Sequence, residues 1–240
     1  MSEGTLKTKA LKGVIWSGLE RLSVQGVQFL VMLVIARILE PKDFGLVGML
    51  AIFLAVAQSL IDSGFSQALI RKQDRADIDN STVFYFNIVV SLILYVILYI
   101  IAPYVSEFYH EPQLTSLMRV MCLIVVINSF AVVQRAIFTA SINFRSQAKA
   151  SFIAAVISGG VGVTLALNGF GVWTLVFQQL INAGISTMML WVFSNWYPQL
   201  VYSWKSFKEL FAFGSKLMIS GLIDTVYNNM YQLVVGNVFS

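Results

Sequence analysis

Apolar residues occur along this chain in blocks of about 20, and the segments between the blocks hold most of the charged residues. A helix of about 20 apolar residues is long enough to cross the ~30 Å hydrocarbon layer of a membrane. The pattern therefore predicts six membrane-spanning helices followed by the beginning of a seventh. We expect the spans over residues 12–39, 44–70, 83–103, 114–138, 151–168 and 172–194, with the seventh beginning near residue 215.

The composition supports this fold class. Hydrophobic residues make up 58% of the chain and charged residues 12%, whereas about a quarter of the residues of a soluble domain are charged. The sequence therefore predicts an all-α, polytopic membrane bundle. Its one cysteine, Cys122, lies in an apolar segment and its one histidine, His110, lies between spans, so we expect no disulfide framework, no metal site and no cofactor.

The distribution of basic residues predicts the orientation of the bundle. With the N-terminus in the cytoplasm, the external ends of the spans hold only Arg37, Lys42 and Arg119. The cytoplasmic segments then hold Lys7, Lys9, Lys12, Arg71, Lys72, Arg75, Arg145, Lys149, Lys205, Lys208 and Lys216. This asymmetry follows the positive-inside rule. It accounts for the net charge of +4 without a nucleic acid partner.

The chain divides into three expected regions. Residues 1–195 form a six-helix N-terminal lobe, residues 196–214 a cytoplasmic linker, and residues 215–240 a seventh span that opens an incomplete C-terminal lobe. In the linker, Trp204, Phe207 and Phe211 recur at helical spacing, which suits a short amphipathic helix on the inner leaflet. A plain linker without a helix is the alternative. The motif Ser-Gly-Leu at residues 17–19 recurs at residues 220–222, as expected for internal repeats of a transporter.

Polar residues interrupt the apolar spans at helical spacing. In the first span, Ser17, Arg21, Gln25 and Gln28 cover an arc of roughly 80°, with Glu20 at its margin. The same pattern recurs on four further spans: Gln58 and Asp62; Asn128 and Arg135; Gln178 and Asn182; Asp224, Tyr227, Asn228 and Tyr231. Each ionisable group at bilayer depth costs ~2.5–3.5 kcal/mol, so these groups require partners or water.

Two interpretations of these stripes are open. The side chains could be interhelical pairs that hold the bundle together, such as Arg21 with Asp62, and Arg135 could extend to the membrane surface. Alternatively, stripes on several helices could line one hydrated central cavity, which we favour because they need a common interior. Arginine binds phosphate through forked donors, and amides and tyrosines suit sugar hydroxyls and ring faces. A lipid-linked phosphorylated sugar matches each of these features.

Small residues and missing motifs complete the picture. Gly159, Gly160 and Gly162 lie within a predicted span with no strand before them, so they indicate close helix packing and not a nucleotide-binding loop. The sequence contains no phosphate-binding loop and no pairing of a nucleophile with a base. It therefore predicts a protein that is not an enzyme.

Four stretches resemble one family of transporters. ARILEPKDFGL at residues 36–46 is similar to the "ARLL-x-P-x-DFG" signature that follows the first span of the polysaccharide transporter family. DSGFSQALI at 62–70, GFGVWTLV at 169–176 and FAFG at 211–214 are also similar to that family. These are bacterial flippases of the multidrug/oligosaccharidyl-lipid/polysaccharide exporter superfamily, in lipopolysaccharide O-antigen, capsule or exopolysaccharide synthesis. The resemblance covers essentially the whole chain, which looks like the N-terminal half.

The resemblance implies two six-helix lobes around a central cavity, in the bacterial cytoplasmic membrane. It also implies a substrate of sugar units on polyprenyl pyrophosphate, moved to the outer leaflet by alternating access, with polysaccharide polymerase machinery as a further partner. On this hypothesis Arg21 and Arg135 contact the pyrophosphate, and Glu20, Asp62 or Asp224 responds to a coupling ion. Two alternatives remain: a cation-coupled multidrug exporter on the related fold, and a truncated membrane partner that does not transport.

Overall fold

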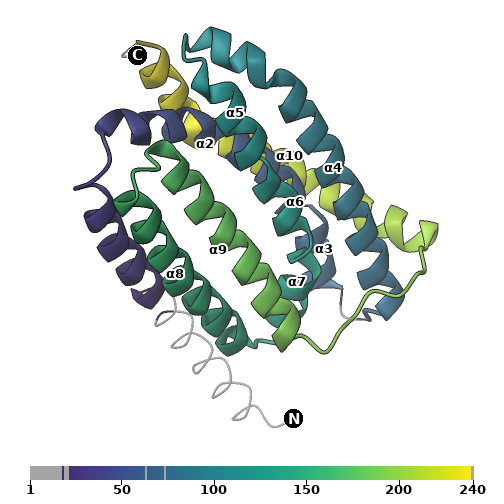
Figure 1. The fold of residues 1–240 in the computed structure, drawn as a ribbon. Helices are drawn as coiled ribbons and strands as arrows, with labels where there is room; N and C mark the ends of the chain where they lie inside the picture. The colour runs from purple at the N-terminus through teal and green to yellow at the C-terminus, as the bar shows by residue number, and fades with distance from the viewer. Residues whose placement is uncertain (1–17, 19–21, 63, 73, 239–240) are drawn as a thin grey trace.

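The computed structural model describes residue 18 and residues 22–62, 64–72 and 74–238, with side chains as far as residue 228. Every regular element in these residues is a helix (Figure 1). A first apolar helix covers Leu22–Ile35. It is followed by α2 (Pro41–Asp62), α3 (Phe65–Arg71), α4 (Asp77–Phe108), α5 (Gln113–Met121), α6 (Leu123–Ser129), α7 (Val132–Ala140), α8 (Phe144–Leu167), α9 (Val172–Phe193) and α10 (Trp204–Val238).

The helix lengths confirm the predicted polytopic membrane bundle. Among the described residues, five helices are long and apolar enough to cross a membrane, and α5 to α7 make a sixth candidate if counted as one bent span. That span, expected as one helix over 114–138, is broken into three helices with a bend of 42° between Ser129 and Val132. Helices α2 and α3 together make one candidate span, Pro41–Arg71, in agreement with the span expected over 44–70. Hydropathy locates a span, but local packing decides where its helix breaks.

The turns at one end of the bundle are short. Residues 168–171 join α8 to α9, and both Gly169 and Gly171 adopt positive φ, at 76° and 53°. Residues other than glycine rarely adopt that conformation, so these two glycines allow the chain to reverse direction within a short turn. The resulting antiparallel pair α8–α9 makes the most extensive helix contact in the described structure (Figure 1).

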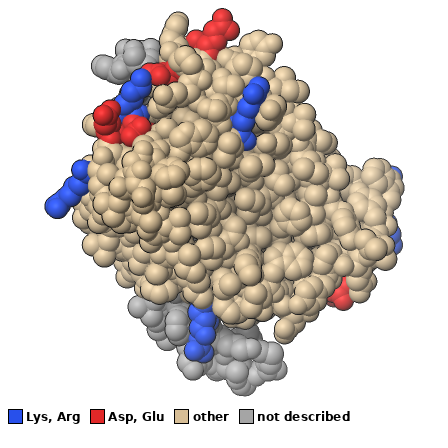
Figure 2. Space-filling view, in the orientation of Figure 1, with Lys and Arg blue, Asp and Glu red and all other residues tan. Residues whose placement is uncertain are grey.

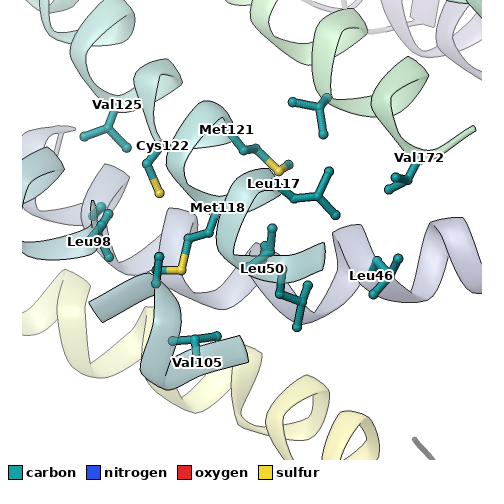
Figure 3. Close-up of a cluster of buried hydrophobic side chains, with 14 of the residues drawn as sticks. Leu46, Leu50, Leu98, Val105, Leu117, Met118, Met121, Cys122, Val125 and Val172 are labelled. Atoms are coloured by element: carbon teal, nitrogen blue, oxygen red, sulfur yellow. The ribbon is translucent and has the colours of Figure 1, made fainter. Parts of the chain in front are cut away.

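The largest apolar cluster lies where α2, α4, α5, α6 and α9 meet. Leu50, Leu117 and Met121 are at most 1% exposed, and Leu46, Leu98, Val105, Met118, Cys122, Val125 and Val172 surround them (Figure 3). In a membrane, such a cluster stabilises the bundle by close van der Waals packing, because lipid chains are as apolar as the interior. We refer to this cluster as the apolar core.

The outer surface has the character of a membrane protein. Large apolar side chains such as Leu92, Val96 and Ile100 on α4 are about half exposed. On the face in Figure 2, charged side chains lie toward its ends and edges, and the broad centre carries none. An uncharged belt of this kind suits contact with lipid.

α10 is one continuous helix from Trp204 to Val238, so no break marks the expected boundary between linker and seventh span near residue 215. It packs mainly against α2 and α3. Gly64 and Gly214 meet so closely that a Cβ on either would lie 2.8–2.9 Å from the backbone of the other. Small residues therefore permit this helix crossing.

Lys72 strengthens the same contact, because its Nζ lies 3.2 Å from both Asp79 and Glu209 and so joins α3, α4 and α10. Burial alone lowers the pKa of Lys72, but its bonds to these carboxylates outweigh burial and raise the pKa above the ordinary value. The ammonium group therefore stays charged, and the contact is kept at neutral pH.

Candidate transport cavity

A cavity of about 630 Å³ opens between the first helix, α6, α7, α8 and α9. Its polar lining comes from all five elements: Gln28, Asn128, Arg135, Ser158, Gln178, Gln179, Asn182 and Ser186. Phe29, Val31, Met32, Ile124, Ala155 and Ala183 supply its apolar lining. A chamber of this size and mixed lining lies within the range typical of ligand sites.

Helical spacing explains how α9 contributes several polar groups. Gln178, Asn182 and Ser186 are four residues apart, so they fall on one face of that helix and line the cavity together. Asn182 Nδ2 also donates a hydrogen bond of 3.0 Å to Ser158 Oγ on α8. This bond joins the two helices at the wall of the cavity.

A chain of hydrogen bonds leads from the cavity wall to a carboxylate. Asn128 Nδ2 donates to Gln58 Oε1 at 2.9 Å, and Gln58 Nε2 donates to Asp62 Oδ2 at 2.6 Å. All three side chains are partly buried. The arrangement couples α6 to α2 and supplies the Asp62 carboxylate with a donor, as a carboxylate inside a bundle requires.

Arg135 supplies the positive charge of this region. It lies on α7, directly after the bend that separates α6 from α7, and lines the cavity with its side chain partly buried. Its charge acts on the Asp62 carboxylate. Gln147 Nε2 donates to the Arg135 carbonyl oxygen at 3.0 Å and so holds this part of α7 against α8.

Glycines bring the first helix and α9 close to α8, as the sequence predicted. A Cβ on Gly159 would lie 2.5 Å from Cγ2 of Val31, and one on Gly162 would lie 3.1 Å from the side chain of Gln178. Nothing lies within 4 Å of such an atom on Gly160. Two of the three glycines therefore face helices that form the cavity.

The structure brings together five of the residues that the sequence assigned to a cavity lining or to a phosphate site: Gln28, Asn128, Arg135, Gln178 and Asn182. Gln58 and Asp62 adjoin the lining through the hydrogen-bonded chain. Gln25 is exposed and does not belong to the lining. The spacing of polar residues thus predicted five of the eight polar residues in the wall, although Gln25 lies only three residues before Gln28 and is not among them.

The described side chains of helix α10, as far as residue 228, do not line the cavity. Asp224, Tyr227 and Asn228 are exposed and lie on a helix that packs against α2 and α3. Ser17, Glu20 and Arg21, and the side chain of Tyr231, fall outside the described residues. Their expected roles stay predictions.

Sequence reasoning missed Ser158, Gln179 and Ser186, which also line the cavity. Ser186 continues the four-residue spacing of Gln178 and Asn182, so the pattern contained a signal for it. Ser158 lies among small residues, where a packing role is the ordinary interpretation. Within the part of the chain that the structure describes, no three His, Cys, Asp or Glu side chains gather into a group able to hold a metal ion.

Comparison with known proteins adds a family to this geometry. The sequence profile of a family described as "Polysaccharide biosynthesis protein" matches residues 34–240. The succinoglycan biosynthesis transport protein ExoT of Rhizobium meliloti (strain 1021) is 28% identical over 218 residues, which are 90% of this chain and 44% of ExoT. The lipopolysaccharide biosynthesis protein WzxC of Escherichia coli (strain K12) is 22% identical over 98% of this chain and 48% of WzxC.

Two further matches extend the comparison. The teichuronic acid biosynthesis protein TuaB of Bacillus subtilis (strain 168) is 22% identical over 97% of this chain and 48% of TuaB. The inward-facing structure of a multidrug resistance MATE family transporter of the MOP superfamily has a TM-score of 0.61 at 18% identity, covering 93% of this chain and 56% of that chain. The fold is therefore similar to that of this transporter structure, and the chain spans about half the length of the curated relatives it matches.

Proposed function

The chain belongs to the family of polysaccharide biosynthesis proteins, and from that premise we propose that it forms the N-terminal lobe of a flippase for lipid-linked oligosaccharides. The flippase moves sugar units on polyprenyl pyrophosphate across the bacterial cytoplasmic membrane, for lipopolysaccharide, capsule or exopolysaccharide synthesis. It works by alternating access and not as an enzyme. The substrate lipid and the surrounding membrane are its partners, and polysaccharide polymerase machinery is a further one.

The polar cavity inside a bundle of membrane-length helices is the observation that carries this proposal. A chamber of about 630 Å³ lined by an arginine, amides and hydroxyls has no structural purpose in an apolar bundle, where close packing is more stable. Amides and hydroxyls offer both donors and acceptors, as the hydroxyl groups of a sugar require. The same lining supports passage of a polar head group through the membrane.

Arg135 is the proposed contact for the pyrophosphate. A guanidinium group binds phosphate oxygens through two parallel hydrogen bonds, which a lysine cannot reproduce. Arg135 lines the cavity, and four neutral amides surround the same space: Gln28, Asn128, Gln178 and Asn182. Arg21 in the first span is the proposed second contact.

Asp62 is the proposed site of ion coupling, with Glu20 and Asp224 as further candidates. A proton or sodium ion on Asp62 would neutralise the group that now accepts the hydrogen bond from Gln58 and experiences the charge of Arg135. The hydrogen bond from Gln58 to Asp62 would then weaken, and with it the chain that connects α2 to α6. A coupling ion would thereby change the electrostatic potential that Arg135 and Asp62 together produce at the cavity.

We propose that the N-terminus lies in the cytoplasm. The connections α3–α4, α7–α8 and α9–α10 lie at one end of the bundle, and the segments at that end contain Arg71, Lys72, Arg75, Arg145, Lys149, Lys205 and Lys208. The opposite end contains Arg37, Lys42 and Arg119. The positive-inside rule places the first end in the cytoplasm.

Replacement of Arg135 tests the transport role. In a strain that depends on this gene for surface polysaccharide, Arg135→Ala should reduce the polymer at the cell surface at least about tenfold, because loss of a bidentate charged contact costs more than ~1.4 kcal/mol. Arg135→Lys should restore only part of the export. Surface polymer would be measured by immunoblot, and membrane levels of the protein by an epitope tag.

Arg119→Ala is the matched control. Arg119 is also a partly buried helix arginine, but it stacks on Tyr99 at 4.2 Å and does not line the cavity. We expect normal export from this variant. Normal export from Arg135→Ala at wild-type protein level would refute the pyrophosphate contact.

A further inference from the structure

A second pocket lies at the end of the bundle that we place in the cytoplasm. Its volume is about 670 Å³, and its walls come from the segment before α4 and its first turn, the end of α7 with residues 141–143, and residues 193–199 after α9. Only Ile137, Phe138 and Phe193 bring purely apolar side chains. Nothing in the proposed transport role accounts for a second polar pocket away from the cavity.

Three lining residues carry buried polar atoms without a hydrogen-bond partner. These atoms are Nη1 of Arg75, Oδ1 of Asn80 and Nε1 of Trp196. Asn80 as a whole is only 7% exposed. An unpaired buried polar atom is unfavourable and occurs only a few times in a domain. Two donors and one acceptor at one pocket therefore indicate a polar ligand that pairs with them after small side-chain rotations.

The backbone is strained at the same pocket. Ile142, between the lining residues Ser141 and Asn143, has a φ of 57°, a left-handed conformation that is an outlier for a β-branched residue. The backbone N–H of Asn143 donates a hydrogen bond of 2.8 Å to the backbone carbonyl of Phe138. Helix α7 therefore ends in a Schellman motif, which usually has glycine at the position that Ile142 occupies. Strain retained without glycine is typical of functional sites.

The composition of the wall indicates the class of ligand. Arg75 and Asp77 are oppositely charged, and the remaining polar groups are neutral amides, hydroxyls and the indole of Trp196. Tyr197 lines the pocket and is 67% exposed. The centroid of its ring lies 6.2 Å from that of Trp191. Open aromatic faces beside neutral amides suit the apolar ring face and the hydroxyl groups of a neutral sugar.

We infer that this pocket binds neutral sugar residues, and that it is a subsite at the cytoplasmic end for the glycan of the substrate before entry into the membrane cavity. The inference rests on the proposed function for the identity of the glycan. Binding of sugar itself depends only on the pocket. The pyrophosphate would then be held at Arg135 and the glycan at Tyr197 and Asn80, at separate places on the lobe.

Binding of defined disaccharides to the full chain in lipid nanodiscs tests the inference. Cellobiose, lactose and diacetylchitobiose would be examined by saturation-transfer NMR, with inorganic pyrophosphate as the anionic probe. We expect at least one disaccharide to bind, and Tyr197→Ala to weaken its binding up to about tenfold through loss of the aromatic face. Arg75→Gln should weaken disaccharide binding less than Tyr197→Ala does, because glutamine keeps a hydrogen-bond donor.

Tyr104→Ala is the matched control, because Tyr104 is 68% exposed and lies near the opposite end of α4. This variant should bind disaccharide as the wild type does. Absence of disaccharide binding, or equal binding by Tyr197→Ala and wild type, overturns the inference. The inference is also overturned if the protein binds pyrophosphate but no disaccharide, and if Arg75→Gln abolishes that binding. The site would then prefer anionic ligands.

The export assay separates this inference from the proposed function. If Arg135→Ala loses surface polymer while Tyr197→Ala binds disaccharide normally, only the sugar subsite is refuted. If Arg135→Ala exports normally while disaccharide binding depends on Tyr197, the pocket stands and the transport role of Arg135 fails. Circular dichroism of each variant would confirm that its helices form.

Discussion

The apolar core and the candidate transport cavity share helices α6 and α9 but differ in what fills them. Val125 and Asn128 are three residues apart on α6; the first packs in the core at 1% exposure and the second lines the cavity. The core is filled by interlocking aliphatic and sulfur-containing side chains (Figure 3). The cavity leaves about 630 Å³ open and is bridged by hydrogen bonds.

This difference separates the residues that stabilise the bundle from those that line the proposed transport cavity. Van der Waals packing in the core can hold α2, α4, α5 and α6 rigid while the cavity side retains space for a head group. The first helix and α9, which line the cavity, approach α8 closely at Gly159 and Gly162. Substitutions in the two regions should therefore affect different properties of the protein.

The largest effect on stability is expected in the core. Leu117→Ala removes a side chain that is 0% exposed and leaves an unfilled space among Leu50, Met121 and their neighbours. We expect a loss of about 2–5 kcal/mol in the free energy of unfolding. Equilibrium unfolding in mixed detergent micelles, followed by circular dichroism, would measure it.

Leu92→Ala makes the same change on the lipid-facing side of α4, where Leu92 is 47% exposed. Its effect should stay within about 0.5 kcal/mol. Equal effects of the two substitutions would contradict the distinction between the apolar core and the lipid-facing surface.

A smaller effect is expected where glycine allows the first helix to approach α8. Gly159→Ala would place its methyl group 2.5 Å from Cγ2 of Val31, so the first helix has to shift at the cavity wall. We expect a loss of about 1–3 kcal/mol in the free energy of unfolding and reduced export. Both would be measured in the assays described above for Leu117 and Arg135.

Gly160→Ala is the matched control for this prediction, because nothing lies within 4 Å of its added methyl group. Alanine favours helix over glycine by up to ~1 kcal/mol, so this variant should be neutral or slightly more stable. A loss of stability as large as that of Gly159→Ala would contradict the explanation by Val31, because no neighbour lies close to the methyl group added at Gly160.

The smallest effect is expected in the hydrogen-bonded chain at the cavity wall. A double-mutant cycle with Gln58→Ala and Asn128→Ala should give a coupling of about 0.5–1.5 kcal/mol, because the pair loses one 2.9 Å hydrogen bond within the bundle. Unfolding in micelles would again supply the four free energies. Strict additivity of the two single changes would mean that the Gln58–Asn128 bond contributes nothing to stability.

Much of the fold and part of the cavity were predictable from the sequence. The apolar blocks predicted the spans because membrane thickness imposes a length on every spanning helix. The four-residue spacing of Gln178 and Asn182 predicted a shared face because an α-helix turns by 100° per residue. Glycines within a span predicted close approach, and Gly159 and Gly162 confirm it.

Other features depended on contacts between helices that are distant in sequence. Arg135 lies just after the 42° bend between α6 and α7 and lines the cavity, whereas helix periodicity alone assumes a straight span. Gln25 and Gln28 share a predicted stripe, yet only Gln28 reaches the cavity. Likewise, α10 carries an amide and an acid at helical spacing, yet this helix packs mainly against α2 and α3.

The sequence by itself determined that this protein is a helical membrane bundle, roughly where its apolar spans lie, and which helix faces carry polar residues. These properties follow from the length and periodicity of single helices. Only the tertiary structure decided which polar stripes meet, where the helices break, and that residues 75–80, 141–143 and 193–199 enclose a second pocket. Those properties depend on the packing of whole helices against one another, which no local pattern of residues encodes.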